Sequence, residues 1–144
     1  MNGKKVNILL SVYNPNVTYL VEQLKSIDNQ TYPNIELLIF DDCVSKRCDV
    51  GIFKKTLNNV KYRILPYKKK NMGYVKAFEY LVEQADGNYI AFCDQDDIWD
   101  KTKIEKCIQC MEKEHTILVV TDRKIIDAEG EATCNSVRHT SKKV

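Results

Sequence analysis

The chain has 144 residues, of which 44% are apolar and 29% are charged, and its formal net charge is +2. This length suits one domain with a substantial core and is too short for two ordinary domains. The near balance of charge excludes a bulk field that attracts nucleic acid, so we expect a specific site and no nucleic-acid partner. No apolar run approaches the ~18 residues of a membrane span, and the N-terminus lacks an apolar signal region, which together predict a cytoplasmic protein.

Strand and helix signals alternate along the chain. Short apolar runs alternate with segments whose apolar residues recur at helical spacing, and Asn14 or Asn16 can cap the first helix. The predicted elements, in order, are a strand at 6–12, a helix at 17–27, a strand at 35–40, a short helix at 52–57, a strand at 62–65, a helix at 74–85, a strand at 89–93, a helix at 101–114, a strand at 117–121 and a hairpin at 124–130.

The strands are almost continuously apolar, which is typical of strands buried on both faces of a parallel sheet. Because helices alternate with them, the sequence predicts a single doubly wound, mostly parallel α/β sheet with flanking helices. We expect this domain to span residues 1–133 and to be followed by a polar, basic, frayed tail at 134–144.

Polar residues gather directly after four of the predicted strands. Ser11 to Asn14 stand at the end of the first strand, and Asp41-Asp42, a loop from Lys68 to Gly73, and Asp94 to Asp97 come after the second, third and fourth. In open α/β sheets, ligands bind beyond the carboxyl ends of the strands. Four polar strand ends that meet at one edge therefore predict a common binding site.

The most informative of these segments holds three carboxylates within four residues, Asp94, Asp96 and Asp97. Such carboxylates repel one another, and hard cations such as Mg²⁺ or Mn²⁺ bind oxygen ligands while keeping positions for phosphate oxygens. A solvated acidic loop is the alternative. An EF-hand calcium loop is excluded, because Ile98 and Trp99 stand where that loop needs an oxygen ligand and a glycine. Trp99 is expected to pack beneath the acidic loop.

Neither a GxGxxG after the first strand nor a GxxxxGK[ST] segment occurs, so phosphates must be held by a metal and not by a glycine cradle. Asp42 can accept a hydrogen bond from the ring N3–H of uracil or thymine, and Tyr13 can stack on that base. Gly73 would allow the backbone to pass close to a ligand, and Lys76 can reach a phosphate. Ordinary structural roles are the alternatives for all four residues.

Six cysteines are many for this length, and without a secretory signal we expect free thiols. Unequal spacing disfavours a zinc site built from Cys43, Cys48, Cys107 and Cys110. A thioredoxin-like role for Cys107 and Cys110 is disfavoured because that pair lies inside a predicted helix.

Four segments, in this order, resemble family 2 glycosyltransferases of the GT-A fold. They are Ser-Val-Tyr-Asn at 11–14, Asp-Asp at 41–42, Asn-Met-Gly at 71–73 and Asp-Gln-Asp-Asp-Ile-Trp at 94–99. The resemblance runs from Val6 to about Glu131. The form of the last segment is similar to that of bacterial rhamnosyltransferase-like enzymes, which build polysaccharide from nucleotide-activated sugars.

The resemblance implies a metal-dependent transfer of a sugar from a UDP- or dTDP-sugar to a saccharide or lipid-linked saccharide acceptor. It also implies a location in the cytoplasm, peripheral at the inner face of the membrane. The residues that match nucleotide-sugar contacts of the family are Ser11, Tyr13, Asn14, Asp41, Asp42, Asn71, Gly73, Lys76 and Asp94, and those that match the Mg²⁺ or Mn²⁺ ligands are Asp96 and Asp97.

Family members usually extend well past this length, and their later part supplies the catalytic base. No residue here matches that base, so we interpret the chain as the donor-binding portion of a longer enzyme or as a truncated product. Since general base catalysis is worth ~10²–10⁴-fold, we expect little transfer by this chain alone.

The alternative is a non-catalytic interaction domain with the same α/β core, and a homodimer is expected if the rim of the sheet is apolar. A receiver domain is disfavoured, because its paired acids belong where Tyr13 and Asn14 stand.

Overall fold

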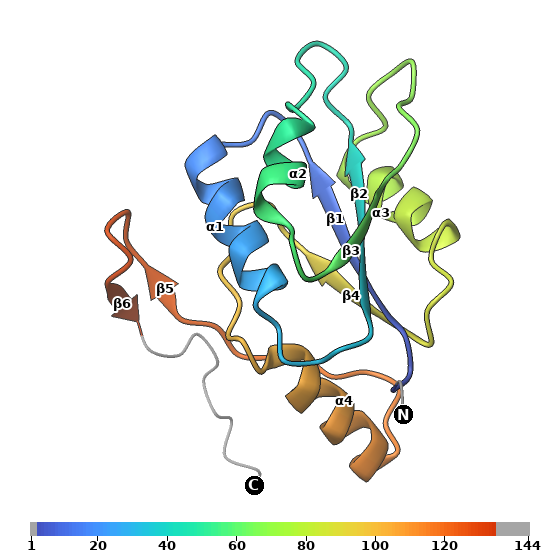
Figure 1. Cartoon of the computed structure of the whole chain (residues 1–144), viewed down its shortest axis with the longest axis vertical. Helices are drawn as coiled ribbons and strands as arrows, with labels where there is room; N and C mark the ends of the chain where they lie inside the picture. Colours follow the sequence, from blue (N-terminus) through green and yellow to red (C-terminus); the bar gives the residue numbers. More distant parts are fainter. Residues whose placement is uncertain (1–2, 135–144) are drawn as a thin grey trace, which may run out of the picture. The chain divides into compact units, whose positions relative to one another are not determined.

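The computed structural model describes residues 3–134. Its elements are β1 (Val6–Val12), α1 (Val17–Asp28), β2 (Ile35–Asp41), α2 (Gly51–Thr56), β3 (Lys61–Ile64), α3 (Tyr74–Glu83), β4 (Tyr89–Cys93), α4 (Lys103–Glu114), β5 (Ile125–Ile126) and β6 (Ala132–Cys134) (Figure 1). The chain divides into two compact units, Met1–Glu105 and Lys106–Val144. The single domain over 1–133 stays a prediction, and the predicted tail lies outside the described residues except for Cys134.

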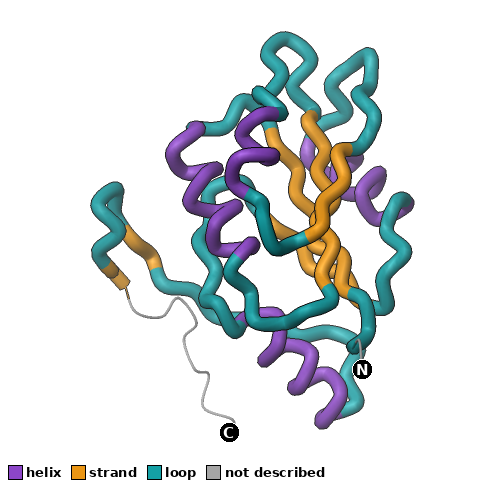
Figure 2. The backbone as a smooth tube through the Cα atoms, in the orientation of Figure 1, coloured by secondary structure: helices purple, strands orange, loops and turns teal. Residues whose placement is uncertain are grey.

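The first unit is built on a sheet whose strands form the central orange group in Figure 2. The strands are parallel and have the order β3-β2-β1-β4. Val12 at the end of β1 lies opposite Asp41 of β2, and Leu10 lies opposite Cys93 of β4. The predicted parallel α/β sheet is therefore confirmed. Because all four strands run in the same direction, the loops that follow them emerge at one edge.

Helices cover the two faces of this sheet, with α1 and α2 on one face and α3 on the other (Figure 1). The α3 face is packed through a cluster of buried side chains that joins this helix to β1 and β2: Leu9, Leu38, Phe40, Leu65, Ala77, Phe78 and Leu81. Since side chains alternate along a strand, Ile8 and Leu10, both fully buried, point to the opposite face. The central strands are thus buried on both sides, as their continuous apolar runs predict.

The edge strand β4 departs from that prediction. Ile90 and Phe92 are 42% and 59% exposed, so one face of β4 is open although its sequence is as apolar as that of β1. Composition cannot reveal this exposure, because burial of an edge strand depends on which elements cover it. This face of β4 exposes two large apolar side chains, and the homodimer itself stays a prediction.

The helices lie where their apolar spacing predicts them, with ends shifted by up to two residues. α1 begins after Asn16, whose Oδ1 accepts a hydrogen bond from the Tyr19 backbone N–H at 3.3 Å, so this predicted cap is confirmed. α1 and α4 have 12 residues each. Within residues 3–134, every helix falls short of the length and apolar character that crossing a bilayer requires.

The predicted strand at 117–121 is wrong. Residues 117–121 form no strand in the structure, and Ile117 and Leu118 are 96% and 70% exposed. β-branched residues favour an extended backbone, but a strand also needs a partner to pair with. The hairpin predicted at 124–130 is present as the antiparallel pair β5 and β6.

A buried carboxylate joins the end of α1 to the turn before β3. Oδ1 of Asp28 accepts the backbone N–H groups of Asn58, Asn59 and Val60 at 3.0, 2.8 and 3.0 Å, and Oδ2 accepts from Asn59 Nδ2 at 3.1 Å. Asp28 is 8% exposed. One anionic acceptor thus satisfies backbone donors that the turn would otherwise bury unpaired.

Asp28→Asn should lower the free energy of unfolding by about 1–2 kcal/mol, because these hydrogen bonds lose their charged acceptor and the new amide faces the Asn59 amide. Urea unfolding measures the change. Asp86→Asn is the control, since Asp86 is an exposed carboxylate paired with Lys5 at 2.7 Å, and such pairs contribute little. Equal effects of the two substitutions would contradict the role given to Asp28.

Candidate functional site

A cavity of about 510 Å³ opens at the carboxyl edge of the sheet. Its walls come from the segments that follow β1, β2 and β4 and from the loop that leads into α3. The lining residues are Ser11, Tyr13, Asp42, Asn71, Gly73, Tyr74, Asp94, Gln95 and Asp96.

The register of the sheet explains why these residues meet. Because Val12 lies opposite Asp41, the next residues, Tyr13 and Asp42, emerge side by side. Because Leu10 lies opposite Cys93, Asp94 follows at the level of Ser11. Ser11 and Asp94, which are 83 positions apart in the sequence, thus line the same cavity.

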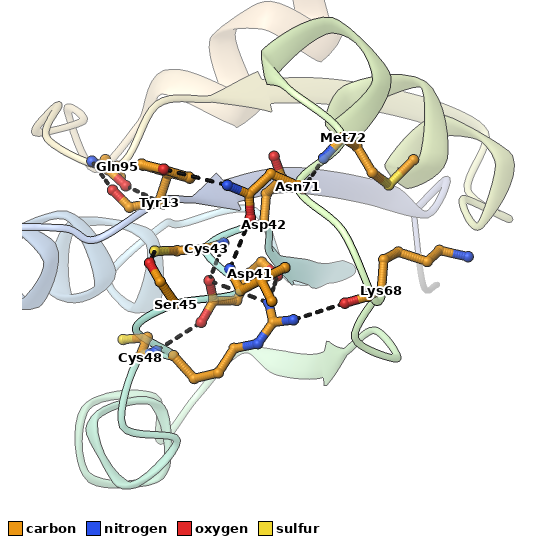
Figure 3. Close-up of polar contacts among 12 residues, drawn as sticks. Tyr13, Asp41, Asp42, Cys43, Ser45, Cys48, Lys68, Asn71, Met72 and Gln95 are labelled. Atoms are coloured by element: carbon orange, nitrogen blue, oxygen red, sulfur yellow. Dashed lines mark hydrogen bonds and ion pairs between the residues drawn. The ribbon is translucent and has the colours of Figure 1, made fainter.

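Asp42 holds the loop that leads into α3. It is 4% exposed, and one of its carboxylate oxygens accepts the backbone N–H of Met72 at 2.7 Å (Figure 3). The other accepts the backbone N–H of Gly73 at 2.9 Å. Gly73 has a φ of +84°, a left-handed conformation that side-chain-bearing residues rarely adopt. The glycine therefore serves the local turn, with its N–H aimed at Asp42.

Asn71 ties this loop to two neighbouring strand ends. Its Oδ1 accepts the Val44 backbone N–H at 2.9 Å, and its Nδ2 donates to the Tyr13 hydroxyl at 3.5 Å. Tyr13 as a whole residue remains 52% exposed beside the cavity. The polar contacts thus fix the end of the Tyr13 side chain while its ring face stays accessible.

Asp41 lies beneath the loop that follows β2 and does not line the cavity. It is 3% exposed, and its oxygens accept the backbone N–H groups of Cys43 at 2.9 Å and Cys48 at 2.7 Å (Figure 3). Arg47 lies 3.8 Å from the same carboxylate and donates to the Lys68 carbonyl at 2.9 Å. Burial, followed by the charge of Asp41, raises the pKa of the Cys48 thiol. Asp41 therefore organises the loop that carries Asp42.

The acidic loop carries negative charge that the described part of the chain does not neutralise. None of the ion pairs found among residues 3–134 includes Asp94, Asp96 or Asp97. Partial burial, followed by the charges of Asp97 and Asp96, raises the pKa of Asp94. The Asp94 charge in turn raises the pKa of the Tyr74 hydroxyl.

The loop is anchored from below, as predicted for Trp99. This residue is 6% exposed, and its backbone N–H donates to Ser26 Oγ at 3.0 Å. At the start of the loop, Gln23 of α1 donates through Nε2 to Cys93 Sγ. Helix α1 thus holds both ends of the acidic segment.

The oxygen donors of this loop fit a hard divalent cation. Asp94 and Asp96 both line the cavity, yet residues 3–134 contain no group of three His, Cys, Asp or Glu side chains placed to hold a metal. A protein-only metal cage is therefore not formed by the described chain. Mg²⁺ characteristically uses one or two carboxylates and completes its coordination with water and substrate phosphates, which suits this donor set.

The remaining predicted site residues lie outside the cavity lining. Asn14 follows Tyr13 with a left-handed φ of 41°, and Lys76 and Asp97 are exposed. Two lining residues were not predicted, Tyr74 and Gln95. Their position, one beside Gly73 and one inside the acidic segment, was the signal that could have identified them.

A protein-family model and the similar proteins all indicate a glycosyltransferase family. The model of glycosyl transferase family 2 matches residues 7–137. An uncharacterized glycosyltransferase of Rickettsia conorii is 33% identical over 131 residues, which cover 90% of this chain and 21% of that protein. The Escherichia coli protein WfgD, named as a UDP-Glc:alpha-D-GlcNAc-diphosphoundecaprenol beta-1,3-glucosyltransferase, is 31% identical over 127 residues, covering 88% of this chain and 49% of WfgD.

The fold also matches solved structures. The crystal structure of Staphylococcus aureus TarS superposes with a TM-score of 0.68 at 25% identity, covering 77% of this chain and 20% of TarS. A structure of TarS residues 1–349 in complex with UDP-GlcNAc also gives 0.68, at 22% identity, over 86% of this chain and 37% of that one. The predicted GT-A type of α/β fold is thereby confirmed.

The chain spans from about a fifth to about half of the length of these curated relatives. The family match covers most of the chain and includes all the residues that line the cavity. This chain belongs to glycosyl transferase family 2.

Proposed function

We propose that this chain binds the donor of a metal-dependent glycosyltransferase that transfers sugar from a UDP- or dTDP-sugar to a saccharide or lipid-linked saccharide in bacterial polysaccharide synthesis. One observation carries the proposal: a single cavity combines an exposed aromatic ring, a buried carboxylate and two aspartates that lack a described counter-charge. The ring can stack on a nucleobase, the buried carboxylate can accept a hydrogen bond from that base, and the two aspartates can bind a cation that holds a diphosphate. The transferred sugar, including rhamnose, stays a prediction.

The nucleoside half of the proposed site consists of Tyr13 and Asp42, with Ser11 beside them. Each Asp42 oxygen accepts one backbone N–H, and an ionised carboxylate has about four lone-pair positions, so acceptor capacity remains for a ligand. The backbone contacts hold the carboxylate in one orientation. It can then accept the N3–H of uracil or thymine while the base stacks on the Tyr13 ring.

The diphosphate half consists of Asp94 and Asp96, with Asp97 next to them. These carboxylates would hold Mg²⁺ or Mn²⁺, which when bound would neutralise charge on the departing nucleoside diphosphate. Tyr74 lines the same cavity as Asp94. Lys76 is exposed in the first turn of α3, outside the cavity lining, and in this proposal its ammonium group would approach a phosphate oxygen.

In the proposed reaction, an acceptor hydroxyl attacks the anomeric carbon of the sugar and the bond to the nucleoside diphosphate breaks. The residues assigned here bind and orient the donor for that step, and Asp41 supports them through the loop after β2. The name of the relative WfgD, with a UDP-sugar donor and a lipid-linked acceptor, supports the classes of donor and acceptor.

Calorimetry with UDP, dTDP and CDP, each with and without Mn²⁺, tests the proposal. We expect UDP and dTDP to bind in the presence of Mn²⁺ and to bind at least ~10-fold more weakly without it. CDP is the matched control, because N3 of cytosine is an acceptor that would face the Asp42 carboxylate, and we expect at least ~10-fold weaker binding of CDP. Absent heats, or equal heats with and without the metal, would refute the proposed donor site.

A further inference from the structure

The side chain of Gln95 connects the two halves of the cavity. Its Oε1 accepts the Tyr13 backbone N–H at 2.8 Å, and its Nε2 donates to the Tyr13 carbonyl at 3.4 Å (Figure 3). One side-chain amide thus meets both backbone groups of one residue, as a neighbouring strand would.

This contact occurs where the backbone pairing of β1 with β4 has already ended. The last paired residues are Leu10 and Cys93, and beyond them the chain of the acidic loop turns away. Gln95 therefore continues the connection between the two strand ends by means of its side chain. It links Tyr13, assigned to the nucleoside, with the segment that contains Asp94 and Asp96.

The connection extends to the opposite wall. The Tyr13 hydroxyl accepts from Asn71 Nδ2, and Asn71 lies in the loop whose backbone N–H groups bind Asp42. Movement of the acidic loop would therefore displace Tyr13 and disturb its contact with the loop on the far side.

We propose that Gln95 is a positioning residue that couples cation binding to nucleotide binding, an inference that rests on the proposed donor site. When a cation draws the Asp94 and Asp96 carboxylates together, the two hydrogen bonds of Gln95 hold Tyr13 in place for the base. Such coupling is reciprocal, so the nucleotide tightens binding of the cation by the same factor.

The chemistry of the contact restricts which side chains can replace Gln95. Asparagine keeps the amide but is one methylene shorter. Glutamate keeps the reach but has no donor for the Tyr13 carbonyl, and it adds a fourth negative charge beside Asp94, Asp96 and Asp97. Methionine keeps the length and volume without either hydrogen bond.

Gln95→Met is therefore the primary test, with Gln95→Asn as the second variant and Gln109→Ala, at an exposed position of α4, as the control. UDP is titrated with and without Mn²⁺, and Mn²⁺ with and without UDP. The coupling factor is the ratio of the affinity for one ligand in the presence of the other to its affinity alone. We expect this factor to be about tenfold smaller in both Gln95 variants and unchanged in Gln109→Ala. A purely structural role of Gln95 would lower the melting temperature and leave this factor intact.

A measurement without ligand provides an independent check. Because Gln95 Oε1 accepts the Tyr13 N–H, hydrogen exchange at that amide should become about tenfold faster in Gln95→Met. Unchanged exchange would overturn the proposed contact. Metal-dependent UDP binding with an unaltered coupling factor would overturn the inference and leave the donor site standing, whereas failure of the unaltered chain to bind UDP would overturn both.

Discussion

Asp96→Ala should abolish Mn²⁺-dependent UDP binding and leave the fold intact. Asp96 lines the cavity, is exposed, and lies beside two other carboxylates. Removal of one of the two acidic-loop carboxylates that line the cavity, Asp94 and Asp96, leaves the cation too few protein ligands. Since loss of residues that merely support a metal ligand costs 10–100-fold, loss of a ligand should cost at least ~100-fold in affinity.

The expected stability distinguishes a binding defect from misfolding. Removal of Asp96 relieves repulsion between like charges, so the urea midpoint should stay equal or rise. Calorimetry with Mn²⁺ and UDP measures the affinity. Asp97→Ala should lower the affinity by only about tenfold, because Asp97 contributes negative charge from outside the cavity lining. Glu79→Ala on α3 is the control for loss of an exposed carboxylate. Metal-dependent affinity that survives in Asp96→Ala would disprove the ligand assignment.

The parts of the site that sequence could predict are those determined by the strand ends. Each apolar run is a local signal, and a parallel sheet brings the residues that follow the runs to one edge. Ser11, Asp42 and Asp94 therefore lie together in the structure as predicted. This grouping follows from the direction of the strands alone and does not depend on particular side-chain contacts.

Contacts between residues that are far apart in the sequence could be identified only from the structure. Asp41 and Asp42 are adjacent and chemically identical, yet only Asp42 faces the cavity, because neighbouring residues at a strand end point in opposite directions. Gln95 acts on Tyr13, 82 residues away, and the sequence around Gln95 contains no sign of its partner. The open face of β4 depends in the same way on packing and not on local composition.

Asp42→Asn should lower both the stability of the loop before α3 and the preference of the site for a uracil base. One oxygen becomes an amide donor, so either the Met72 or the Gly73 N–H loses its acceptor and meets another donor. Loss of a buried acceptor of this kind costs about 2 kcal/mol of unfolding free energy. Because the same change removes the fixed acceptor for N3–H, UDP affinity should fall by at least ~100-fold, as expected when a charged acceptor is lost in a buried contact.

The neighbouring residue provides the matched comparison. Asp41→Asn removes a charged acceptor from the Cys43 and Cys48 N–H groups, so we expect a similar loss of stability with a much smaller loss of UDP affinity. The preference for UDP over CDP gives a further readout. An asparagine at position 42 can donate to N3 of cytosine as well as accept from uracil, so the preference should shrink in Asp42→Asn and persist in Asp41→Asn. Equal losses of UDP affinity and of base preference in the two variants would show that stability of the loops, and not contact with the base, determines binding.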